Sequence, residues 1–248
     1  MNTHTFFDLN LRTEAELFKG SDDWRTTVVP YTVDANQAAL LLCDVWDDHW
    51  CKGAARRVDA MAPRMQAVVA AARDRGLQII HAPSDTMACY EGVPQRERIR
   101  AITPAPLPEP RVLPDPPLPI DDSDGGCDSG EPPWHRAWSR QHPAIVIEEP
   151  DVISDSGQEI YSFLQQRGID HLLIMGVHTN MCVLKRSFTI KQMTRWGVRC
   201  LLMRDLTDAM YNPARAPFVS HDEGTALVIQ YIERHWCPSF LSSDLAPL

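Results

Sequence analysis

One cysteine of the chain stands where a nucleophile is expected. Cys182 lies in the stretch GVHTNMCV, directly after a short apolar run, 171–175, that has the length of a buried strand. From Met181 onward apolar residues recur at helical spacing up to Gly197, which places the cysteine at the first turn of a helix. A helix N-terminus carries partial positive charge and free N–H groups, which favour a thiolate over a thiol. The pattern predicts a nucleophile, with a buried inert thiol as the alternative.

An aspartate is the best candidate for the base that this cysteine needs. Asp44 follows the apolar run 38–43, which also has strand length, and it opens the segment DVWDDHWC. In an open parallel sheet, ligands bind at the carboxyl ends of the strands, so we expect Asp44 and Cys182 to meet there. A carboxylate beside a thiol can take its proton and later deliver it to a leaving amine.

Apolar periodicity along the chain alternates between strand and helix. Strands are also expected at 77–81, 144–147 and 198–203, and helices at 56–75, 156–167 and 223–235. Strands that alternate with helices predict a parallel sheet covered by helices on both faces. A further strand could come from the N-terminal residues or from the C-terminal SFLSS.

The 248 residues suffice for one α/β domain with its own core. We divide the chain into an N-terminal arm, 1–37, a domain, 38–240, and a tail, 241–248. A proline-rich insertion at about 90–143 interrupts the domain, and it cannot form a central strand because proline lacks the backbone donor. We expect the insertion to lie over the active-site end, with Trp134, His135 and Trp138 anchoring its return. The alternative is a disordered linker.

Composition narrows the class of partner. The net charge is -9, which argues against nucleic acid or an anionic membrane as partner. No apolar stretch has membrane-spanning length, and the first residues lack a signal-peptide pattern. The seven cysteines show neither a CxxC pair nor zinc-like spacing, as expected for reduced thiols. We therefore expect a cytoplasmic protein that acts on a small molecule.

Three parts of the chain carry a resemblance to a known family: ALLLCDVWDDHW, GVHTNMCV, and RGIDHLLIMG with WGVRCLLMRDLTDA. Together they resemble the isochorismatase-like cysteine hydrolase superfamily, which includes nicotinamidases, N-carbamoylsarcosine amidases and ureidoacrylate hydrolases. The resemblance spans about residues 36–240 and implies a doubly wound, Rossmann-like α/β fold with a six-stranded, mainly parallel sheet. It also implies hydrolysis of an amide, ureido or carbamoyl C–N bond through a thioester on Cys182, with Asp44 as general base and acid, commonly in a homo-oligomer.

The resemblance also implies an oxyanion site. The peptide bond corresponding to Val177–His178 is cis in the family, which would turn the backbone N–H groups of His178 and Cys182 toward a developing oxyanion. Around this site we expect four side chains to bind substrate: Trp46, His49, His178 and Tyr90.

The chain departs from the family at the third catalytic residue. The family has a lysine there, and its spacing from Gly168 places Glu149 at that position, or Glu148 after a shift of one residue. A carboxylate beside Cys182 would raise the pKa of its thiol, whereas a lysine would lower it. The missing cation could come from another side chain, for which His49, His178 and Lys185 are candidates. Lys185 and Arg186 otherwise read as a solvated helix face.

Two alternatives to cysteine hydrolysis remain open. Because the lysine is absent, the chain could be an altered or inactive member that keeps the fold as a binding or assembly module. It could also be a metal-dependent hydrolase that gathers Asp47, Asp48, His49 and His81. Nicotinamidases of the family bind a divalent metal through an Asp-x-His pair, but the corresponding loop here, HAPSDTMACYEG, lacks that pattern. We therefore expect no metal and no cofactor.

Overall fold

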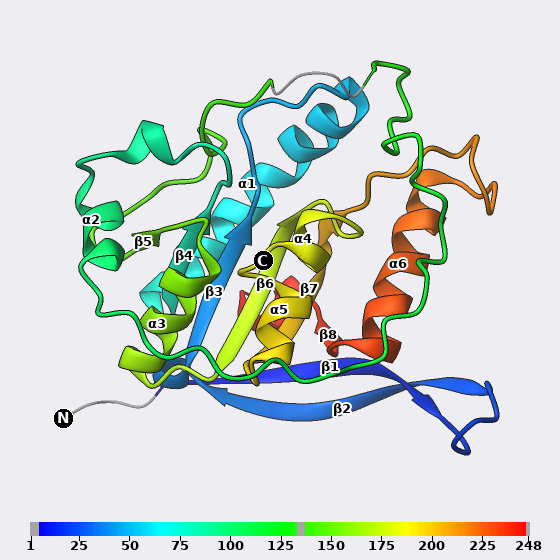
Figure 1. Ribbon diagram of the computed structural model, residues 1–248, viewed down its shortest axis with the longest axis horizontal. Helices are drawn as coiled ribbons and strands as arrows, with labels where there is room; N and C mark the ends of the chain where they lie inside the picture. Colours follow the sequence, from blue (N-terminus) through cyan, green and yellow to red (C-terminus); the bar gives the residue numbers. More distant parts are fainter. Residues whose placement is uncertain (1–4, 133–136, 247–248) are drawn as a thin grey trace.

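A computed structural model describes residues 5–132 and 137–246, and within them the chain forms one sheet flanked by helices (Figure 1). The strands are β1 Phe6–Glu16, β2 Trp24–Asp34, β3 Ala38–Cys43, β4 Gln78–Ala82, β5 Val152–Ile153, β6 His171–Val177, β7 Arg199–Asp208 and β8 Ser239–Phe240. The α-helices are α1 Lys52–Asp74, α2 Pro94–Arg100, α3 Gly157–Arg167, α4 Cys182–Lys185, α5 Ile190–Arg195, α6 His221–His235 and α7 Ser242–Leu245. Two 3₁₀ helices are η1 Ala35–Gln37 and η2 Met87–Tyr90. No helix of these residues is long and apolar enough to cross a membrane.

The sheet has eight strands rather than the six predicted, in the order β2-β1-β8-β7-β6-β3-β4-β5. The strands from β8 to β5 pair in parallel, as predicted. The N-terminal residues add an antiparallel hairpin, in which Phe6 lies opposite Asp34 and Glu16 opposite Trp24. Figure 1 shows this hairpin running along the lower edge of the sheet, across the direction of the parallel strands. The N-terminal segment is therefore part of the sheet.

Strand β3 shows why both faces of the sheet are covered. Leu40 and Leu42 belong to the core beneath α1 and α7, whereas Leu41 and Cys43 belong to the core beneath α3, α4, α5 and α6. Successive side chains of a strand point to opposite faces, so an uninterrupted apolar run buries both. All six residues of β3 are buried. The carboxyl end of this strand is consequently held rigidly between two layers.

The strand predicted at 144–147 is not formed. β5 takes the place beside β4, and its Val152 and Ile153 are fully buried there. The run 144–147 lies in a turn and loop, where the Val146 side chain is 48% exposed. The carboxyl end of this strand is therefore at Ile153, beyond Glu149. A short apolar run alone does not distinguish a buried strand from a partly buried loop.

The helix predicted from Met181 to Gly197 is divided into α4 and α5. The Thr189 hydroxyl donates to the carbonyl oxygens of Cys182, at 2.8 Å, and Arg186, at 3.0 Å. Such side-chain bonds offer the backbone an alternative to helical pairing. Arg186 has extended backbone angles, with ψ of 152°. The break therefore redirects the Arg186 side chain away from the line of a continuous helix.

Candidate active site

Asp44 lies at the end of β3 and its side chain is completely buried. One oxygen, Oδ1, accepts hydrogen bonds from the Ser84 backbone N–H, at 2.7 Å, and from the Ser84 hydroxyl. The other, Oδ2, accepts from the Arg186 Nε at 3.2 Å. Burial raises the pKa of Asp44, while the Arg186 charge, Cys182 and Ser84 act to lower it. The carboxylate is thus firmly oriented and more basic than an exposed aspartate.

Cys182 begins α4, and its thiol interacts with the Asp44 carboxyl. Burial of the sulfur raises the pKa of Cys182 well above its usual value, and the Asp44 charge raises it further. The Arg186 guanidinium and the His178 backbone N–H oppose this rise. Cys182 therefore rests as a thiol, and its proton must pass to a base when it attacks. Asp44 is the carboxylate in place for that transfer.

Arg186 supplies the positive charge that the sequence leaves unassigned. Its Nε lies 3.2 Å from the Asp44 Oδ2, and its Nη2 lies 3.2 Å from the Asp85 Oδ2. Burial acts to lower the pKa of Arg186, but the Asp44 charge outweighs it, so the guanidinium stays charged. The sequence suggests a solvated helix face for this residue, and that expectation is wrong. The helix break at Arg186 is what turns its side chain toward Asp44.

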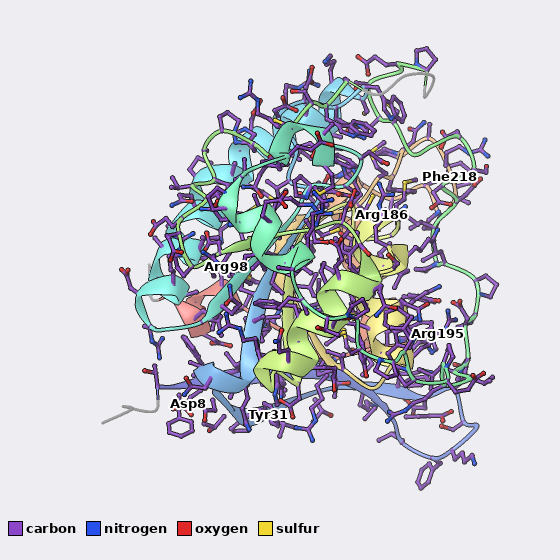
Figure 2. All side chains as sticks on the ribbon, turned by 60° about the vertical axis from the view of Figure 1, so that its left-hand side comes forward. Asp8, Tyr31, Arg98, Arg186, Arg195 and Phe218 are labelled. Carbon is purple, nitrogen blue, oxygen red and sulfur yellow. The ribbon has the colours of Figure 1, made fainter. Side chains whose placement is uncertain are left out.

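Glu149 does not reach this site, contrary to the sequence expectation. Its side chain is 83% exposed and forms an ion pair with Arg98 of α2. Glu148 is no better placed, because it pairs with Arg73 at 3.0 Å. Arg98 and Arg186 are well separated in Figure 2. The misplacement follows from the absent strand at 144–147, on which the spacing argument depended.

The backbone beside Cys182 provides candidate oxyanion donors. The Val177–His178 peptide bond is cis, which is the geometry that the resemblance implies. The His178 backbone N–H interacts with the Cys182 thiol. The Cys182 N–H stands at the start of a helix, where backbone donors lack intrahelical partners. Gly176 permits the close approach of β6 to β3, because a Cβ there would lie 2.0 Å from the Cys43 carbonyl oxygen.

Three stacked rings form an aromatic wall beside Asp44: Trp46, His49 and Trp138. The Trp46 and Trp138 rings are 4.1 Å apart at 10°, and the His49 and Trp138 rings 5.4 Å apart at 11°. Asp44, Trp46, His49 and His178 help to line a cavity of about 10 Å³, which has room for a single water. The sequence singles out Trp46 and His49 for this place but Trp138 only as an anchor. Trp134 and His135 lie outside the described residues.

Neither histidine near the site can replace the missing lysine. Burial lowers the pKa of His178 to about 3 and that of His49 to about 4, so both rings are neutral near pH 7. The two rings meet edge to face, with centroids 4.9 Å apart. Lys185 is exposed. Among the described residues, the cation that contacts Asp44 is Arg186, which is not among the candidate cations named from the sequence.

Tyr90 lies outside the cavity beside Asp44. Its hydroxyl accepts a hydrogen bond from the Gln141 backbone N–H at 2.8 Å, and it lines a separate cavity of about 360 Å³. Gln141 in turn forms a β-bridge with Trp46. Tyr90 is therefore linked to the aromatic wall through Gln141. The expectation that Tyr90 contacts substrate directly has no support in this geometry.

The acidic and histidine residues weighed as a metal site do not gather. His81 is buried between Gln141 and Asp151, each 2.9 Å from one ring nitrogen. Asp47 accepts from the Ser139 backbone N–H at 2.8 Å, and Asp48 pairs with Lys52. Each of these side chains is bonded to another group of the protein. The geometry therefore does not support a hydrolase that uses a metal-bound water at this place.

Comparisons with known proteins bear on the fold. No family model matches the chain, and no curated protein matches it. Among solved structures, a cysteine hydrolase from Pseudomonas syringae pv. phaseolicola aligns with a TM-score of 0.54 at 16% identity, covering 86% of this chain and 92% of that one. An isochorismatase from Pseudomonas putida has a TM-score of 0.51 at 13% identity, covering 84% and 90%. A putative isochorismatase from Burkholderia xenovorans has a TM-score of 0.51 at 17% identity, covering 84% and 85%.

These similarities extend over most of each chain. At such identities they establish the architecture and leave the substrate open. The chain has the α/β fold of the isochorismatase-like cysteine hydrolases.

Proposed function

We propose that this protein is a cysteine hydrolase that cleaves a C–N bond of a small amide, ureido or carbamoyl compound. The observation that carries the proposal is the row of three side chains Cys182, Asp44 and Arg186. The buried Asp44 carboxylate interacts with the Cys182 thiol and accepts a hydrogen bond from the Arg186 guanidinium at 3.2 Å. A nucleophile, a base and a group that orients and charges the base are the parts that covalent catalysis requires.

The reaction begins when the Cys182 sulfur attacks the carbonyl carbon and Asp44 takes the thiol proton. The carbonyl oxygen gains negative charge, for which the backbone N–H groups of His178 and Cys182 are the nearest donors. When the tetrahedral adduct collapses, the C–N bond breaks and Asp44 returns the proton to the leaving amine. Water then attacks the thioester with Asp44 again as base, which releases the acid and restores the thiol.

Arg186 performs the electrostatic work that a lysine performs in the resembled family. Its charge lowers the pKa of both Asp44 and Cys182. An ionised Asp44 is needed at the start of each half-reaction, so a cation that favours the carboxylate preserves the base in a buried setting. A second anchor at Asp85 holds the guanidinium in place.

The aromatic wall favours a planar substrate. Rings at this spacing offer flat apolar faces, and amide, ureido and carbamoyl groups are themselves planar. The cavity of about 10 Å³ beside the wall has room for a single water, and Cys182 does not line it. Trp138 is the member of this wall that comes from the proline-rich insertion.

A panel of small primary amides, ureido acids and N-carbamoyl amino acids tests this function directly. We expect ammonia release from at least one of these classes. We also expect the release to stop when Cys182 has been fully alkylated by iodoacetamide, with modification verified by mass spectrometry. Hydrolysis that persists after full alkylation of Cys182 would remove the thioester mechanism.

A further inference from the structure

A second cluster of reactive side chains lies apart from Cys182, where the proline-rich insertion meets the start of α1. The sulfurs of Cys51 and Cys127 and a carboxylate oxygen of Glu131 all lie within 4.8 Å of one another. Cys51 is fully buried and Cys127 is 6% exposed. The hydrolase chemistry above uses none of these groups, and no spacing in the sequence signals them, because Cys51 and Cys127 are far apart in the chain.

The distances in this cluster match the edges of a metal tetrahedron. Zn–S bonds of about 2.3 Å and Zn–O bonds of about 2.0 Å place a sulfur and an oxygen ligand roughly 3.5 Å apart. The Cys127 sulfur lies 3.4 Å from the Glu131 Oε2. The Cys51 sulfur lies 3.4 Å from the Ser129 hydroxyl oxygen and 3.6 Å from the Asp128 Oδ1, and Asp128 already pairs with Arg57 at 2.6 Å.

The surroundings hold the carboxylate in position. The Glu131 Oε2 accepts hydrogen bonds from the Ser129 hydroxyl, at 2.6 Å, and from the Lys52 backbone N–H, at 3.2 Å. The Ser129 hydroxyl accepts in turn from the Gly53 N–H at 2.8 Å. Ligating carboxylates in metal sites are oriented by hydrogen bonds of this kind. The first backbone N–H groups of α1 also favour negative charge, which two thiolates and a carboxylate would bring.

We propose that Cys51, Cys127 and Glu131 bind one thiophilic divalent cation of the Zn²⁺ class. Two thiolates with a carboxylate suit Zn²⁺ and disfavour Mg²⁺ or Ca²⁺, which prefer oxygen ligands. Both cysteines enter the complex as thiolates, so binding releases two protons to solvent.

Such a site would tie the insertion to the segment that carries the aromatic wall. Cys127 and Glu131 belong to the insertion, whereas Cys51 follows His49 by two residues and precedes α1. The Cys51 N–H donates to the His49 ring at 3.1 Å, which links the two places directly. A cation bound by Cys51, Cys127 and Glu131 would hold these two parts of the chain together.

Cobalt titration of the full-length, reduced and metal-free protein tests the proposal. We expect one Co²⁺ per chain, with the near-ultraviolet absorption of thiolate-to-cobalt charge transfer and the strong visible bands of tetrahedral cobalt. Zn²⁺ should displace the cobalt and remove both signals. The Cys51→Ser/Cys127→Ser double variant should lose the charge-transfer absorption, and Cys89→Ser, which alters an exposed cysteine, should keep it.

Two outcomes would overturn the site: wild-type protein without charge-transfer absorption, or a double variant that retains it. If the double variant does not fold by circular dichroism, Glu131→Gln provides the second test, because it leaves both sulfurs in place. We expect it to bind Co²⁺ at least about tenfold more weakly than wild type. Unchanged affinity in Glu131→Gln would contradict the proposed ligand set.

Discussion

Cys182→Ser should lower the turnover of a cleaved amide by about 10⁴-fold or more, with the fold intact. The hydroxyl nearly matches the thiol in shape but is far harder to ionise, and Asp44 is too weak a base to activate it. Burial raises the pKa of the Cys182 thiol, so even the thiol is hard to deprotonate in this site. The less acidic serine hydroxyl would be harder still to deprotonate. Steady-state ammonia release from the best substrate of the panel measures the effect.

Cys89→Ser serves as the matched control for this substitution. Cys89 is an exposed thiol in η2 and takes no part in the proposed chemistry. We expect its turnover to equal that of wild type. Full activity in Cys182→Ser would refute the proposed nucleophile.

Asp44→Asn should reduce turnover by roughly 10³- to 10⁴-fold, because the amide keeps the shape of the carboxylate and cannot accept the thiol proton. The same reasoning fixes the pH profile of the wild-type protein. The folded-state pKa of Asp44 is raised, so activity should fall on acidification at a higher pH than for an ordinary aspartate. In Asp44→Asn this acid limb should be absent from any residual activity.

Stability should respond to Asp44→Asn in the opposite sense from activity. A carboxyl whose pKa is raised by folding binds more protons in the folded state, so wild-type stability falls as pH rises through that window. Above the window the buried charge is a net destabilising element that asparagine removes. We expect the urea midpoint of Asp44→Asn at neutral pH to be no lower than that of wild type. A large loss of stability would show that the activity change reflects unfolding.

Glu149→Gln is the control for the loss of a carboxylate. Glu149 is 83% exposed and pairs with Arg98 at the surface, where such ion pairs contribute little. Turnover and its pH profile should match those of wild type. A loss of turnover comparable to that of Asp44→Asn would show that Glu149 acts at the active site.

Strong periodicity allowed much of the fold to be predicted from sequence. β3 occupies the predicted 38–43, and α3, Gly157–Arg167, falls within the helix predicted at 156–167. The β1–β2 hairpin could not be predicted in the same way. The residues of β2 are mostly exposed, so that strand lacks the buried alternation that reveals a strand in sequence.

The candidate site was predictable where it depends on strand ends and not where it depends on tertiary contacts. Asp44 and Cys182 follow apolar runs, and the sheet brings them together. Arg186 reaches Asp44 only because the Thr189 hydroxyl helps to end α4, a local competition that helical spacing does not reveal. Ser84 was missed for a related reason, since its contact with Asp44 depends on the turn after β4.

The role of Arg186 is the part of the account that departs most from the resembled family, and the alkylation rate of Cys182 tests it without any substrate. Iodoacetamide modification at one mildly alkaline pH, followed by mass spectrometry, reports the thiolate fraction of Cys182. Arg186 lowers the pKa of this thiol, so Arg186→Gln raises it and should slow alkylation about tenfold or more. Arg186→Lys should restore most of the rate, and Lys185→Gln, at the exposed neighbouring cation, should leave it unchanged. An Arg186→Gln rate equal to that of wild type would contradict the triad of Cys182, Asp44 and Arg186.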